Sequence, residues 1–103
     1  MALKLKNSWF YKGDDWWDWE AFIDDEGSGE LSNVDYVEYV LHPTFPNPLR
    51  KITNPQGGFR LKTSSWGPFY LKAFVHYKDV GKKPEPLELL LKLHTDPMQG
   101  TSN

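Results

Sequence analysis

The sequence contains no cysteine, and this absence excludes several kinds of architecture. Neither a disulfide framework nor a cysteine-ligated zinc site can stabilise the chain. The lack of cysteine fits a reducing compartment, so we expect an intracellular, cytoplasmic location. At 103 residues the chain is long enough to bury one core without cross-links. We therefore expect one domain over residues 1–97 and a tail or linker over residues 98–103.

Long apolar runs and a basic excess are also missing. No segment approaches the length that crosses a membrane, and residues 1–6 lack the apolar part of a signal peptide, so we expect no membrane contact in this segment. The formal net charge of −2 conceals an asymmetry, because residues 1–40 carry ten acids against three lysines. Residues 41–103 carry four acids against nine lysines and arginines. This balance argues against direct nucleic-acid binding.

Recognisable catalytic and metal-binding patterns are absent as well. There is no G-x-S-x-G, no cysteine nucleophile and no glycine loop of the kind that binds phosphate. The acidic loop at residues 24–30 lacks the spacing and the closing glutamate of a calcium loop, and the three histidines lack metal-ligand spacing. Four acids near the N-terminus are candidates for an acid–base pair, although acids in turns and on strand faces are usually solvated: Asp14, Asp15, Asp18 and Glu20. We expect no catalysis, no cofactor and no metal site.

The sequence is instead rich in aromatic residues and in alternating apolar patterns. Aromatics make up 16% of the chain, with five tryptophans, and this composition favours strands. Alternation predicts strands at residues 3–11, 16–24, 34–41, 59–63, 69–77 and 87–93, and no segment longer than a turn has helical periodicity. The spacing of these segments predicts an all-β, immunoglobulin-like β-sandwich of about seven to eight antiparallel strands.

The same alternation predicts which side chains form the core. Six residues of four strands fall on mutually consistent faces: Tyr39, Leu41, Leu71, Val75, Leu89 and Leu91. In the second strand Trp17 and Trp19 share the apolar face, and Trp16 points to the opposite side. Tryptophans exposed in this region would provide faces for a sugar ring, so a carbohydrate-binding sandwich is one alternative function.

The most distinctive stretch is residues 37–50, where a strand leads into a loop stiffened by Pro43, Pro46 and Pro48. The loop carries a histidine, a threonine and a phenylalanine, His42, Thr44 and Phe45. Local physics leaves two interpretations of it. The loop is a rigid recognition element, or Phe45 plugs the end of the core.

The ordered motif Val37-x-Tyr39-x-Leu41-His42-Pro43-Thr44-Phe45-x-x-Pro48-x-Arg50, followed by Trp66-Gly67-Pro68-Phe69, resembles the YEATS domain. Together with the upstream segments Trp16-Trp17-Asp18-Trp19 and Phe22-Ile23, it is most similar to the prokaryotic YEATS-like branch, over about residues 10 to 94. The resemblance implies an immunoglobulin-like sandwich. In eukaryotic members this fold binds acylated lysine, acetyl or crotonyl, on histone tails by placing the flat acyl amide between two aromatic rings.

The resemblance also assigns roles to individual positions. Phe45 and Trp66 would supply the two rings, and the hydroxyl of Thr44 would bind the acyl-lysine amide. The backbone N–H of Trp66 would bind the acyl carbonyl, His42 would line the channel, and Phe69 would lie beside its floor. Ser65 and Pro68 depart from the residues usual in eukaryotic readers. The candidate ligand-binding set is His42, Thr44, Phe45, Ser65, Trp66, Gly67 and Phe69.

These observations predict a non-enzymatic binding module whose partner is an acylated-lysine peptide or protein, and which is one domain of a larger chain. The principal alternative is a structural or protein–protein interaction domain that does not bind acyl-lysine.

Overall fold

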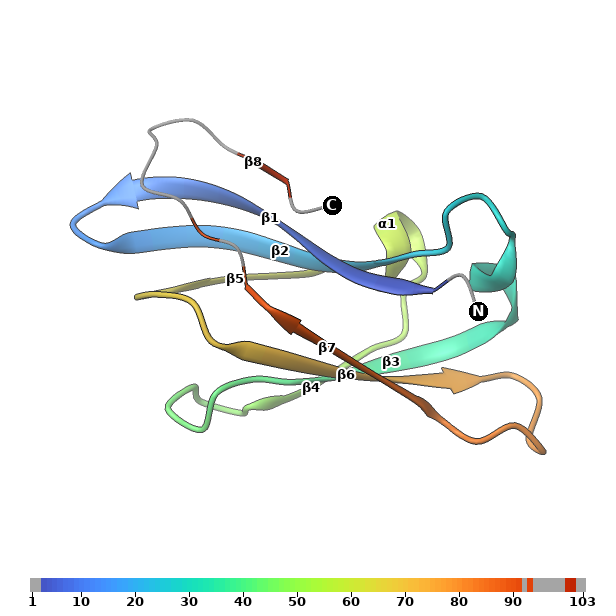
Figure 1. The fold of residues 1–103 in the computed structure, drawn as a ribbon. Helices are drawn as coiled ribbons and strands as arrows, with labels where there is room; N and C mark the ends of the chain where they lie inside the picture. The colour runs from blue at the N-terminus through green and yellow to red at the C-terminus, as the bar shows by residue number, and fades with distance from the viewer. Residues whose placement is uncertain (1–2, 92, 94–99, 102–103) are drawn as a thin grey trace.

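The computed structural model describes residues 3–91, 93 and 100–101, and these form two antiparallel sheets packed face to face (Figure 1). The first sheet has the order β5-β2-β1-β8, with β1 (Lys4–Gly13), β2 (Trp16–Asp24), β5 (Leu61–Ser65) and β8 (Gly100–Thr101). The second has the order β4-β3-β6-β7, with β3 (Val34–Val40), β4 (Leu49–Ile52), β6 (Tyr70–Tyr77) and β7 (Glu85–Leu90). The predicted all-β sandwich is confirmed.

The core lies between the sheets and follows the predicted alternation. Five of the six predicted core residues are buried, and the sixth, Leu89, is half-buried and packs against them. Trp17 and Trp19 are buried at 6% and 1% exposure, whereas Trp16 is 42% exposed. The two faces of β2 were therefore predicted correctly.

Two short helical segments, η1 (Glu30–Asn33) and α1 (Gln56–Phe59), connect the strands, and α1 corrects one predicted boundary. The strand expected at residues 59–63 begins at Leu61, because Phe59 closes the turn with a φ of +56° and buries its ring. A Cβ on Gly58 would lie 2.3 Å from the carbonyl oxygen of Ile23, so only glycine permits this close approach to β2.

The turn is also tied to the second sheet. The hydroxyl of Tyr39 donates a hydrogen bond of 2.7 Å to the carbonyl oxygen of Phe59. Burial raises the pKa of this phenol. The hydrogen bond fixes α1, and with it the start of β5, relative to β3.

The last predicted strand, residues 87–93, also has different bounds in the structure. β7 spans Glu85–Leu90, and Pro86 is tolerated because β7 is an edge strand of its sheet. Alternation with the leucines of this segment predicts that Lys92 and His94 face outward, and both lie outside the described residues. Of the predicted tail, only Gly100 and Thr101 are described, and they pair with β1. Within the described residues, no helix has the length and apolar character needed to cross a membrane.

Three connections lie at the same end of the sandwich, on the left in Figure 1: the β1–β2 turn, the β3–β4 loop and the β5–β6 loop. The last two carry all seven candidate ligand-binding residues, except that Ser65 is the final residue of β5. The topology therefore brings together two loops that are some twenty residues apart in sequence.

Candidate ligand-binding cleft

The β3–β4 loop is fixed by hydrogen bonds to its own backbone. The amide of Leu41 donates to the carbonyl oxygen of Pro48 (2.7 Å), which closes the base of the loop. The guanidinium of Arg50 donates to the carbonyl oxygens of Asn47 (2.6 Å) and Pro46 (2.9 Å). With three prolines limiting its φ angles, the loop presents Thr44 and Phe45 in a defined position.

The β5–β6 loop is anchored by a serine. Ser65 is 1% exposed, and its hydroxyl accepts a 3.0 Å hydrogen bond from Nε1 of Trp19 and donates one of 3.0 Å to the carbonyl oxygen of Gly67. These two bonds connect the loop to the core. The residue between them, Trp66, remains 46% exposed.

A cleft of about 290 Å³ lies between these two loops. We call it the aromatic cleft, and it is lined by Trp16, Thr44, Phe45, Pro46, Arg50, Thr63, Ser64, Ser65 and Trp66. The two aromatic residues singled out by the sequence therefore line one cavity. The lining contains one arginine and no carboxylate, so the cleft is not suited to an unpaired cation.

The rings of the cleft are supported from behind by Phe69 and His42. Phe69 is buried, and its ring centroid lies 5.4 Å from that of Phe45 and 6.0 Å from that of His42. The His42 ring in turn packs edge-on against Trp66, at a centroid distance of 5.6 Å and an interplanar angle of 89°. These contacts fix the orientation of both cleft rings without burying Trp66.

The hydroxyl of Thr44 is oriented by His42. The backbone N–H of Thr44 donates to Nδ1 of His42 (3.2 Å), so this nitrogen carries no proton. The Thr44 hydroxyl lies 2.8 Å from the same Nδ1, and with the imidazole proton on Nε2 it donates to this nitrogen. The oxygen lone pairs of Thr44 then remain able to accept a hydrogen bond from a ligand N–H group.

The structure separates the seven predicted site residues into two groups. Thr44, Phe45, Ser65 and Trp66 line the aromatic cleft, whereas His42, Gly67 and Phe69 lie behind it and position the first group. Phe45 is half-buried and packs against the core, so it also helps to close the end of the core, whereas Trp66 is 46% exposed and is not part of the core. Direct contact of these residues with a ligand remains a prediction.

Sequence reasoning missed five lining residues: Trp16, Pro46, Arg50, Thr63 and Ser64. For Trp16 a signal existed, because alternation placed it opposite the core tryptophans. Thr63 and Ser64 gave no signal, since small polar residues near the end of a strand are common. Among the residues that the structure describes, no group of three or more histidines and acids is placed to hold a metal ion.

Comparisons with known proteins show which protein family the chain resembles. A family model described as the prokaryotic YEATS domain matches residues 17–89. Transcription initiation factor TFIID subunit 14 of Schizosaccharomyces pombe is 44% identical over 52 residues, which are 50% of this chain and 21% of that protein. The AF-9 homolog of Kluyveromyces lactis is 32% identical over 66 residues, 63% of this chain and 29% of that protein. The chain thus spans less than a third of the length of either relative.

Solved structures are similar over almost the whole chain. The Yaf9 YEATS domain bound to H3K27ac has a TM-score of 0.76 at 22% identity, covering 97% of this chain and 78% of that one. The yeast AF-9 homolog protein Yaf9 has a TM-score of 0.77, also at 22% identity, covering 97% and 76% of the two chains. At this identity the likeness shows the sandwich fold.

Proposed function

Because the chain belongs to the prokaryotic YEATS domain family, we propose that it is a non-enzymatic module that binds an acylated lysine side chain, acetyl or crotonyl, of a protein partner. The observation that carries this proposal is that Phe45 and Trp66, from separate loops, line one cleft together with the hydroxyl of Thr44. Structures of the Yaf9 YEATS domain with H3K27ac and with an H3K122suc peptide support this class of partner.

Stacking between the two rings provides the main attraction. An acyl amide is planar, so each of its two faces can stack against an aromatic ring. Each buried CH₂ of the acyl chain adds about 0.8 kcal/mol. A crotonyl group, longer than acetyl and still flat, is therefore expected to bind more tightly.

Two hydrogen bonds would fix the amide between the rings. The lone pairs of Thr44, left free because its proton is directed to His42, accept from the amide N–H. The backbone N–H of Trp66 donates to the acyl carbonyl. A ligand that leaves either group unpaired loses about 1–3 kcal/mol, which discriminates against non-amide ligands.

The charge of the cleft favours acylated over free lysine. Arg50 contributes a positive charge to the lining. The lining contains no carboxylate that could balance a second positive charge. A free lysine ammonium would be desolvated beside a like charge, whereas acylation removes its charge. The proposed selectivity therefore follows from the composition of the wall as well as from the rings.

Calorimetric titration with acetyl-, crotonyl-, trimethyl- and unmodified-lysine peptides tests the proposal. Acylated peptides should bind, and Trp66→Ala should abolish binding while costing little stability, because the ring is 46% exposed. Thr44→Val should weaken binding by about 1–2 kcal/mol with the fold intact. Phe74→Ala, which removes a 37% exposed ring from the outer face of the other sheet, is the matched control.

Equal affinity for unmodified and acylated lysine would contradict the proposal. So would the absence of acyl-lysine binding at millimolar peptide, which would favour an interaction domain with a different partner.

A further inference from the structure

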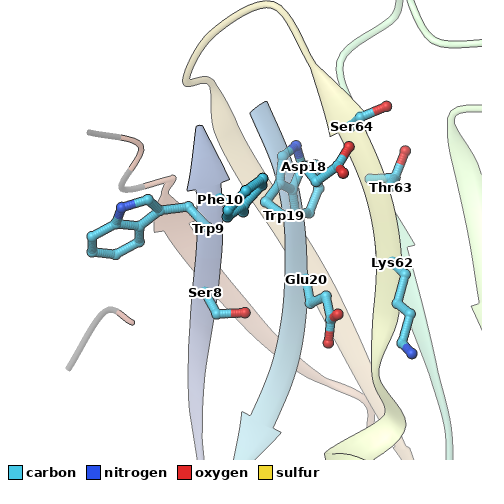
Figure 2. A pocket seen from close by; sticks show the side chains of 9 residues that line it. All are labelled: Ser8, Trp9, Phe10, Asp18, Trp19, Glu20, Lys62, Thr63 and Ser64. Atoms are coloured by element: carbon cyan, nitrogen blue, oxygen red, sulfur yellow. The ribbon is translucent and has the colours of Figure 1, made fainter. Parts of the chain in front are cut away.

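A second cleft, of about 390 Å³, lies on the outer face of the first sheet (Figure 2). Two rows of side chains across three strands form it. Phe10, Asp18 and Ser64 make one row, in register from β1 to β2 to β5, and the adjacent row is Ser8, Glu20 and Lys62. We call this the outer cleft.

The outer cleft adjoins the aromatic cleft. Thr63 and Ser64 of β5 line both of them. On β2, Trp16 lines the aromatic cleft, and Asp18, two residues further along the same strand, lines the outer cleft. A peptide bound in one cleft can therefore reach the other over a short distance along the surface.

The place where the two clefts meet, which we call the junction, combines exposed aromatic rings with a carboxylate that lacks a strong partner. Phe10 is 46% exposed and Trp16 is 42% exposed. Asp18 lies 3.8 Å from Nζ of Lys12, with both side chains about half exposed, at 52% and 50%. A pair at this distance and exposure contributes little to stability, so the carboxylate can exchange its partner at low cost.

The other acid of the outer cleft, Glu20, is already paired. Glu20 accepts a 2.9 Å hydrogen bond from Nη1 of Arg60, which balances its charge. Lys62 lies opposite Glu20 on β5, two residues from Ser64 and further from Trp66. It therefore adds positive charge at the end of the outer cleft that is away from the aromatic cleft. Of the two carboxylates that line the outer cleft, Asp18 is thus the more available to a cation.

We propose that Asp18, with Phe10 and Trp16 beside it, forms a subsite for an arginine of the same peptide that carries the acylated lysine. A guanidinium pairs with a carboxylate through its fork of N–H groups and also packs on aromatic faces. The subsite rests on the proposed function, since the aromatic cleft sets the register of the peptide.

Strand geometry limits where in the peptide the arginine lies. Asp18 is one strand across and about two residues along from Trp66, a displacement of roughly 8 Å. An extended peptide advances by about 3.3–3.6 Å per residue. The preferred arginine therefore lies within about three residues of the acylated lysine.

The test uses acetyl-lysine peptides with glycine and serine at all other positions. One arginine, or neutral citrulline as its isosteric control, is placed in turn at each of the three positions on either side. At one or more of these positions arginine should bind about 3- to 10-fold more tightly than citrulline. Asp18→Asn should remove that preference and leave the affinity for the uncharged peptide unchanged.

Asp35→Asn is the matched control, because Asp35 is exposed on β3, in the other sheet, and the substitution changes the net charge equally. An equal effect of the two variants would assign the preference to the general field and refute the subsite. Binding of the uncharged acetyl-lysine peptide with no arginine preference would refute the subsite alone.

Failure of every acetyl-lysine peptide to bind would overturn the proposed function and the subsite together. An amide chemical-shift map read on Phe10 and Ser64 gives a second measurement, since both should move with the arginine peptide and less with the citrulline peptide. Shifts at these amides caused instead by a neutral oligosaccharide, without any arginine effect, would mark the outer cleft as a sugar site and refute the peptide subsite.

Discussion

The hydroxyl of Ser65 offers the sharpest test of how the core supports the aromatic cleft. It is buried, accepts from Trp19 and donates to the carbonyl oxygen of Gly67. Ser65→Ala removes both bonds and leaves one donor and one acceptor unpaired beside the core. Each unpaired buried group costs about 1–3 kcal/mol. We therefore expect the free energy of unfolding to fall by about 2–6 kcal/mol.

Urea denaturation measures this loss directly. For a small domain with a slope of about 1–3 kcal/mol per molar urea, the midpoint should shift by about one molar or more. Ser64→Ala is the control, because Ser64 is the preceding residue and faces the outer cleft, where substitutions usually change stability by less than about 0.5 kcal/mol. An unchanged slope would show that the native fold is retained.

A double-mutant cycle with Trp19→Phe isolates the hydrogen bond between the two side chains. Phenylalanine keeps most of the ring and lacks the N–H group, so Ser65→Ala should cost less in the Trp19→Phe background than in the wild type. A loss below about 0.5 kcal/mol for Ser65→Ala, or costs that add without coupling, would refute the role assigned to this serine.

Three further changes test the core, the α1 turn and one surface ion pair. Leu71→Ala should cost about 2–5 kcal/mol in urea denaturation, since the side chain is fully buried between the sheets. Tyr39→Phe should cost about 1–3 kcal/mol, because it leaves the carbonyl oxygen of Phe59 unpaired, and hydrogen exchange in α1 should quicken. The 2.6 Å hydrogen bond from Lys6 lowers the pKa of Asp24, so the stability from this pair is present above the ordinary carboxyl pKa of about 4 and is lost as pH falls through the lower folded value. Denaturation of the wild type and of Asp24→Asn across pH 2 to 7 should show that the variant lacks this component.

Alternation was a reliable guide where one face of a strand is buried. The burial of Trp17, Trp19 and Tyr39, and the exposure of Trp16, follow from the two-residue period of a strand packed on one side. The start of β5 was not predictable in the same way. It depends on Gly58 lying against the backbone of β2, which is a contact between distant segments.

The candidate site likewise contains residues that the sequence predicts and residues whose place depends on the whole fold. The proline loop and the second aromatic loop were recognisable from short motifs, because their residues are contiguous. Arg50 was part of the motif, yet its place in the cleft wall depends on the loop carbonyls to which it donates. Thr63 and Ser64 line the cleft only because β5 is the edge strand of its sheet, and strand order is a property of the whole fold.

The exposure of Trp66 links the stability of the fold to the proposed function. A ring that is 46% exposed contributes less to folding than a buried one, so its position must be maintained by other contacts. Those contacts are the edge of His42 on one side and the Ser65 hydrogen bonds on the other. Because Phe69 also supports Phe45, the two rings are positioned before any ligand arrives. Under the proposed function, a ligand would therefore lose little free energy to ordering the cleft, and most of the stacking energy would remain available for binding.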